Sequence, residues 1–344
     1  MTDRLEFHRA ATAESLAQRA NDLSWSKVQQ YERCPGHWLA ENHARVLRRD
    51  TQRQDHRHAF PGTILQLVWE AVVNLRLHER RDLATAEALA RWCAAQTRLL
   101  FDLIVMPTAR QFERPQSLWR RYFADDEGAA AIAAARDRGL DAAFGEHLQP
   151  QFVDASTIDG MYGSVEACLR RLGSLYRPLL DELAGHGLGL ERLVAERMLT
   201  APHRGLRLAG RADFLADEGR DGYWLLDGKY RLGGSAEVGQ LYFYALMIEA
   251  TQGVRAGWLG FIDYGQARLV PAGNGSFDPA AKEDLLHRIA AVAAGTRALV
   301  RDVAALSDDR PTFSFHDIPS LELRPGPRNC AFCSVRIACF ARRS

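Results

Sequence analysis

The stretch GRADFLADEGRDGYWLLDGKYR, residues 210–231, decides the fold of this chain. Two apolar runs, RADFLAD and YWLLDGK, are separated by the polar sequence EGRDG, a pattern typical of two strands joined by a turn. The first strand carries Asp213, and the second carries Asp227 and Lys229. Neighbouring strands bring side chains of one face close together, and residues two apart share a face. The sequence therefore predicts two carboxylates and one ammonium group at one place on a hairpin.

The segments around this hairpin predict one α/β fold. Short apolar runs at 190–201, 256–265 and 267–272 have the texture of further strands. Helical periodicity predicts helices at 25–34, 38–49, 63–77 and 236–250, and a long amphipathic helix at 280–307. The order of these elements favours a mixed sheet flanked by helices.

Changes in texture along the chain predict five regions. They are an N-terminal helical region at 1–60, a core helix at 61–75, a helical insertion at 76–190, the sheet-bearing core at 191–300 and a cysteine-bearing C-terminal region at 301–344.

Composition excludes some classes of protein and leaves others open. The 344 residues are 47% hydrophobic and 25% charged, with a net charge of +1, values that are ordinary for a globular enzyme. No apolar run is long enough to span a membrane, and the N-terminus lacks the apolar stretch of a secretory signal. We therefore expect a cytoplasmic protein. The near-zero charge neither indicates nor excludes nucleic-acid binding.

Two carboxylates beside a lysine suit a divalent cation such as Mg²⁺ or Mn²⁺, because hard cations prefer oxygen donors. A cation held there could activate water and neutralise charge on a phosphate. The alternative is a surface hairpin with a Lys–Asp ion pair. The following helix favours the first interpretation, since Gln240 and Tyr244 lie one turn apart on it and face the same way.

Three cysteines near the C-terminus have chelating spacing, namely Cys330, Cys333 and Cys339. They are one short of the usual four ligands, and Cys34 is the natural fourth. Spacing alone leaves a [4Fe–4S] cluster and a zinc ion both open. Cys93 and Cys168, on helical segments, are interpreted as buried apolar residues.

These motifs together resemble the PD-(D/E)XK nuclease superfamily, in particular its RecB/AddB-like branch, which includes CRISPR adaptation nucleases. The family pattern is G-x-x-D on one strand, then (D/E)-x-K, then Q-x-x-x-Y on a helix. The matching residues here are Gly210 with Asp213, Asp227 with Lys229, and Gln240 with Tyr244. The resemblance implies a restriction-endonuclease-like fold and a phosphodiester-cleaving centre.

By that resemblance, Asp213 and Asp227 bind the metal, with the Gly228 carbonyl as a further ligand. Lys229 assists the attacking water or the transition state, and Gln240 and Tyr244 steady the site. The family has a G-x-x-x-H helix whose His is a ligand, whereas here Gln66 follows Gly62 at that spacing. Gln66 is therefore a weaker candidate metal ligand, since an amide oxygen can coordinate a hard cation.

Three other residues near these motifs could be considered as metal ligands. Glu196 is a weaker candidate on the preceding strand. His56 and His58 are interpreted as loop residues.

The segment from Ser24 to Cys34 also resembles the opening helix of the iron–sulfur members of this family. The resemblance therefore favours a structural [4Fe–4S] cluster on Cys34, Cys330, Cys333 and Cys339. Such a cluster would clamp the N- and C-terminal regions together.

The resulting hypothesis is a metal-dependent deoxyribonuclease, an exonuclease or a nuclease acting on single strands, whose partner is single-stranded DNA or a duplex end. DNA repair, CRISPR adaptation, mobile-element and defence roles are all open. Two alternatives remain open: a nucleic-acid-binding subunit with a degenerate site, and a zinc-stapled scaffold. The chain has no phosphate-binding loop of the G-x-x-x-x-G-K-[ST] type, so a helicase, like an integrase-type protein, would be a separate partner.

Overall fold

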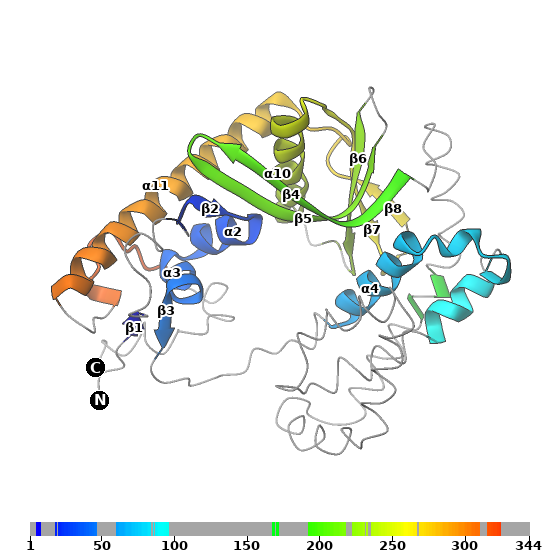
Figure 1. Cartoon of the computed structure of the whole chain (residues 1–344), viewed down its shortest axis with the longest axis horizontal. Coiled ribbons are helices and arrows are strands. Elements are labelled where there is room, and N and C mark those ends of the chain that lie inside the picture. Colours follow the sequence, from blue (N-terminus) through cyan, green and yellow to red (C-terminus); the bar gives the residue numbers. More distant parts are fainter. Residues whose placement is uncertain are drawn as a thin grey trace, which may run out of the picture.

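The computed structural model describes residues 5–7, 18, 20–46, 60–83, 85, 87–95, 167–168, 170–171, 192–217, 222–230, 232, 235–266, 268–309 and 315–324. Within these residues the main feature is a six-stranded mixed sheet flanked by helices (Figure 1). The α/β prediction is therefore confirmed. Its strands are β2 (Asp22–Leu23), β4 (Leu193–His203), β5 (Leu206–Asp217), β6 (Tyr223–Lys229), β7 (Ala256–Asp263) and β8 (Arg268–Pro271).

The strands run in the order β2-β5-β6-β7-β8, and β4 pairs with β5. The pairs β4–β5, β5–β6 and β7–β8 are antiparallel, whereas β2–β5 and β6–β7 are parallel. The parallel β6–β7 pair needs a crossover, which helix α10 (Ser235–Gln252) supplies. The hairpin predicted around Asp213, Asp227 and Lys229 is formed by β5 and β6. The crossover helix α10 carries Gln240 and Tyr244.

The long β4–β5 hairpin turns through Arg204 and Gly205, both of which have positive φ, at 47° and 77°. Two successive residues with positive φ give a two-residue hairpin loop whose twist matches that of the flanking strands. The hairpin curves over α10 in Figure 1.

The remaining described helices surround this sheet. They are α2 (Trp25–Arg33), α3 (Pro35–His43), α4 (Phe60–Asn74) and α11 (Pro279–Asp309). Helix α10 packs against β4, β5, β6 and β7, whereas α4 packs against β4 and β6. Helix α11 runs along α10 and α2, on the side away from α4 (Figure 1).

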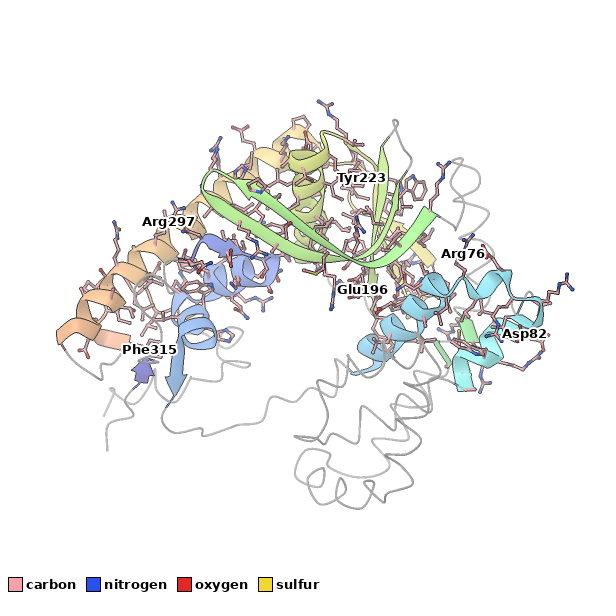
Figure 2. All side chains as sticks on the ribbon, in the orientation of Figure 1. Arg76, Asp82, Glu196, Tyr223, Arg297 and Phe315 are labelled. Carbon is pink, nitrogen blue, oxygen red and sulfur yellow. The ribbon has the colours of Figure 1, made fainter. Side chains whose placement is uncertain are left out.

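Apolar side chains form a core between the sheet and α10, and a second, smaller core joins the chain's two terminal regions. The second core contains Trp38 and Leu39 of α3, Leu299 and Val303 of α11, and Phe315. Figure 2 shows Phe315 beside the end of α11. The N- and C-terminal regions are therefore packed together.

Some predicted boundaries were wrong. The helix expected at 38–49 ends at His43, and Ala44–Val46 forms strand β3, which pairs with β1 (Leu5–Phe7). Pairing with a distant strand overrides the local helical pattern there. Strand β2 was also missed, since it is two residues long and pairs with β5.

Most of the predicted helical insertion at 76–190 lies outside the described residues. Its described part contains short 3₁₀ turns at Leu77–Glu79 and Arg81–Leu83, followed by helix at 87–95. No helix in the described part of the chain is both long and apolar enough to cross a membrane.

Candidate active site

The two motif carboxylates and the motif lysine meet where β5 and β6 pair. Phe214 pairs with Leu226, so one step along the ladder Asp213 lies across from Asp227. The Gly228 N–H donates to Asp213 Oδ2 at 3.0 Å, and Lys229 Nζ forms an ion pair with Asp227. The structure thus brings together the three residues that the hairpin pattern predicted would be neighbours.

Helix α10 adds a polar side chain that connects these groups. Gln240 Nε2 donates to Asp227 Oδ1 and to the Tyr244 hydroxyl, both at 3.1 Å, and its Oε1 accepts from Lys229 Nζ at 3.4 Å. Gln240 therefore contacts an acid, a base and a phenol at once. Its amide orientation is fixed by these partners, because only the nitrogen can donate to the carboxylate.

The glycine of the G-x-x-D motif has a packing explanation. A Cβ added to Gly210 would lie 2.5 Å from the Tyr244 ring and 3.3 Å from Met247 Cε. A larger residue at 210 would push α10, and Gln240 with it, away from the strand that carries Asp213. We name the five polar residues Asp213, Asp227, Lys229, Gln240 and Tyr244 the catalytic cluster, after the role that the motif resemblance implies for them.

Burial and mutual repulsion dominate the electrostatics of the cluster. Asp227 is fully buried. Burial, followed by the neighbouring Asp227 carboxylate, raises the pKa of Asp213 well above its usual range, although Lys229 and the Gly228 N–H act in the opposite direction. Burial also raises the pKa of Tyr244, so its hydroxyl keeps its proton. One lysine does not balance two facing carboxylates, and a second positive charge would stabilise them.

Comparison with protein families gives a match over residues 22–340 to the PD-(D/E)XK nuclease superfamily. The chain belongs to this superfamily. No curated protein matches the chain significantly. Membership of this superfamily indicates a metal-dependent nuclease. Its members generally use Mg²⁺ or Mn²⁺.

The donor set of the catalytic cluster fits a cation of this kind. Asp213 and Asp227 offer carboxylate oxygens, which hard divalent cations prefer. Among the described residues, no three His, Cys, Asp or Glu side chains are grouped closely enough to hold a metal. The Gly228 carbonyl, between Asp227 and Lys229 on β6, is a further candidate oxygen donor.

The structure places Gln66 on α4 beside Gly228, where it accepts a hydrogen bond from the Tyr264 hydroxyl. Tyr264 directly follows β7 and is completely buried. Burial raises its pKa well above the usual range, and the charges of Asp213 and Asp227, and less strongly of Glu196 and Glu70, add to the effect.

Sequence reasoning missed both Tyr264 and Glu70. Glu70 is 6% exposed and lies one turn beyond Gln66 on α4. That helical spacing could have revealed it. Tyr264 had a weaker signal, namely its place at the end of a buried strand.

Glu196 lies across from Asp213 in the β4–β5 hairpin, between the pairs Ala195–Phe214 and Arg197–Ala212. Its φ of 58° is rare for a residue other than glycine and marks local backbone strain. Its side chain is 10% exposed and forms an ion pair with Arg211 (Glu196 is labelled in Figure 2). Glu196 is therefore largely buried beside the catalytic cluster.

Of the four cysteines expected to hold a cluster, only Cys34 lies within the described residues. It is 9% exposed and follows the last residue of α2. A Cβ on Gly36 would lie 2.6 Å from Leu323 and 3.7 Å from Cys34 Sγ, so the C-terminal segment passes close to this thiol.

The remaining predictions concern the other cysteines and two histidines. Cys93 and Cys168 are buried, as predicted. His56, His58, Cys330, Cys333 and Cys339 lie outside the described residues.

Proposed function

We propose that this superfamily member is a Mg²⁺- or Mn²⁺-dependent deoxyribonuclease that acts on single strands or duplex ends. The observation that carries the proposal is the set of hydrogen bonds around Gln240, which joins Asp227, Lys229 and Tyr244 in one partly buried network. A Lys–Asp pair on a plain surface hairpin would not need a helix to orient both partners.

In this proposal Asp213, Asp227 and the Gly228 carbonyl hold the cation, with Glu196 as a weaker candidate because it lies across from Asp213. When bound, the cation polarises the phosphate and lowers the pKa of water. Lys229, whose side chain is 23% exposed, is the cluster's link to solvent and takes the role of assisting the attacking water. Gln240 orients the side chains of Lys229 and Asp227 through its hydrogen bonds, and Tyr244 accepts a hydrogen bond that orients Gln240.

The cleavage test compares two lysines that differ in their surroundings. Lys282 pairs with Glu249 near the opposite end of α10, so Lys282→Ala removes a lysine outside the cluster. We expect Lys229→Ala and Asp227→Ala to lower Mn²⁺-dependent cleavage of linear DNA at least about 100-fold, whereas Lys282→Ala stays within about twofold. Single-stranded, blunt and circular substrates would give the mode of action from product lengths.

Two outcomes would contradict the proposal. Cleavage that is equally strong in all the variants would indicate a contaminant or another centre. DNA binding without cleavage by the parent protein would favour a binding subunit with a degenerate site.

We further propose that Cys34, Cys330, Cys333 and Cys339 hold a [4Fe–4S] cluster. Support comes from the path of the C-terminal segment. Arg324 donates to the Glu32 carbonyl at 2.8 Å, close to Cys34, and Cys330 follows six residues later. Six residues span at most about 20 Å, a length that suits a return of the chain to Cys34.

Iron content of anaerobically purified protein tests this site. We expect four iron atoms per chain in the parent, loss of most iron in Cys34→Ser, and full iron in the matched control Cys93→Ser. Burial raises the pKa of Cys93 to about 12, so this thiol is a poor metal ligand. A colourless protein with one zinc per chain would instead identify the zinc-stapled alternative.

A further inference from the structure

We infer that Gln66 is a positioning residue rather than a metal donor. Together with Tyr264 it forms a buried pair that fills the space behind Gly228 and fixes the backbone between Asp227 and Lys229. The inference rests on the proposed metal site, since it assigns a role beside that site to the residue that replaces a histidine of the family motif.

The first observation concerns the space around Gly228. A Cβ added to Gly228 would collide with both the Tyr264 hydroxyl and Gln66 Oε1. Successive residues of a strand point to opposite faces, so Asp227 and Lys229 point away from this pair and toward Gln240 on α10. Gln66 and Tyr264 therefore occupy the volume that a side chain at position 228 would otherwise fill.

The second observation is that Tyr264 forms a hydrogen bond at each of its ends, to β6 through its backbone and to α4 through its hydroxyl. Its backbone N–H donates to the Lys229 carbonyl at 2.8 Å, and its hydroxyl donates to Gln66 Oε1 on α4. Tyr264 thus connects β6, β7 and α4 at the point where β6 ends. Any shift of Gln66 would be transmitted through Tyr264 to the backbone of Lys229.

The third observation is what the pair holds in place. The Gly228 N–H donates to Asp213 Oδ2 at 3.0 Å, so the orientation of that peptide group sets the orientation of one proposed metal ligand. A glycine has more backbone freedom than any other residue, and it needs packing from outside to stay in one conformation. Gln66 and Tyr264 supply that packing from one side, and Asp213 accepts the hydrogen bond that results.

The fourth observation concerns the Gln66 amide itself. Its oxygen is already engaged by Tyr264, and its nitrogen is buried without a hydrogen-bond partner in the described part of the chain. An amide nitrogen donates hydrogen bonds and cannot ligate a cation. In the reversed amide orientation, the Gln66 oxygen would be free to bind a metal. That alternative predicts that Gln66→Met removes a metal ligand.

Mn²⁺ binding without DNA separates the two roles. Gln66→Met keeps the side chain's length but removes both polar atoms, and Asp213→Asn is the control that must weaken binding. We expect Gln66→Met and Tyr264→Phe to weaken Mn²⁺ binding to a similar extent by calorimetry, about tenfold, because each breaks the hydrogen bond that packs against Gly228 beside Asp213. Unchanged Mn²⁺ binding by Tyr264→Phe, beside weakened binding by Gln66→Met, would indicate that Gln66 is a metal donor and would overturn the inference, whether or not the chain cleaves DNA.

A size-exchange experiment tests the buttress directly, with thermal stability as the readout. Gly228→Ala should lower the Tm of the metal-free protein, because its methyl group has no room. Combining it with Tyr264→Leu shortens the opposing side chain. The double variant should therefore have a higher Tm than the sum of the two single effects predicts. Additive losses would show that Tyr264 does not occupy the space behind Gly228, and they would overturn the inference independently of nuclease activity.

Discussion

Two regions of the molecule differ in the kind of side chain that they bury. The catalytic cluster buries charged and polar groups, with Asp227 fully inaccessible and facing a second carboxylate. The other region, which we name the terminal clamp, consists of α2, α3, α11 and residues 315–324. It buries aromatic and aliphatic side chains and leaves its ion pairs partly exposed. Burying charge costs free energy, whereas burying apolar surface supplies it.

The clamp's contacts show how it supplies stability. Tyr31 and Trp38 pack edge to face with ring centroids 6.0 Å apart. Arg288 forms two hydrogen bonds of 2.7 Å to the Glu32 carboxylate, which joins α11 to α2. Trp25 ends this region on the sheet side, where it packs against Phe243 of α10. The comparison predicts that clamp substitutions change stability and cluster substitutions change activity.

The largest expected effect is at Trp25, where the two regions touch. Its indole ring fills the space that a Cβ on Gly239 would need, directly before Gln240 in α10. Trp25→Ala should lower the free energy of unfolding by about 3–5 kcal/mol, measured by urea titration. The kcat of the folded fraction should stay within about threefold of the parent. A larger fall in kcat would break the comparison and show that the clamp also positions Gln240.

A pair of glycine substitutions separates the regions more sharply. Gly228→Ala should lower activity at least about 100-fold, because the new methyl group meets Tyr264 and Gln66 beside the cluster. Gly295→Ala crowds the Tyr31 ring between α11 and α2, so it should cost about 1–3 kcal/mol of stability. Its activity per folded molecule should be unchanged. Cleavage rates and urea midpoints of both variants test this, and the reverse pattern would contradict it.

The sequence predicted the cluster well because its parts are short-range patterns. Two strands with a polar turn place Asp213 near Asp227, and helical spacing places Gln240 near Tyr244. Each of these relations depends on one element or on a hairpin, so periodicity and turn chemistry were enough to find them.

The features that sequence reasoning missed depend on contacts between distant segments. Tyr264 and Gln66 are 198 positions apart and meet only because α4 lies against the sheet. Strand β3 formed where a helix was expected, since its partner β1 lies far away in the sequence. The strained φ of Glu196 likewise has no local signal such as a glycine. Tertiary contacts decided the first two.

The pH dependence of stability should also differ between the regions. The raised pKa of Asp213 means that the folded protein holds this proton more tightly than the unfolded chain, whose carboxyl titrates near about 4. The associated stability is present below that pH and is lost as pH rises through the folded-state pKa. Asp213→Asn removes the loss.

Without added metal, Asp213→Asn should therefore gain Tm relative to the parent as pH rises from 4 to 8, by at least about 2 °C. The matched control is Asp302→Asn in α11, whose carboxylate accepts from the Ser320 N–H at 2.7 Å. It should show no such gain. A parent and an Asp213→Asn variant with parallel Tm curves across this range would contradict the cause assigned to the pKa shift.

The smallest expected effect distinguishes the two interactions of Arg288. Its guanidinium pairs with Glu32 and also lies 4.9 Å from the centroid of the Trp25 ring. Both side chains of the ion pair are about one-third exposed (35% and 32%), so the pair should be worth only about 0.5–1 kcal/mol, and less in high salt. The stacking on Trp25 adds about 0.5–1 kcal/mol. Glu32→Ala should thus cost less stability than Arg288→Ala in urea titrations, and 1 M salt should reduce the Glu32→Ala effect proportionally more. Equal losses at both salt concentrations would show that the Trp25 ring adds nothing to the ion pair, and that the effect of Arg288 on the clamp is one of charge alone.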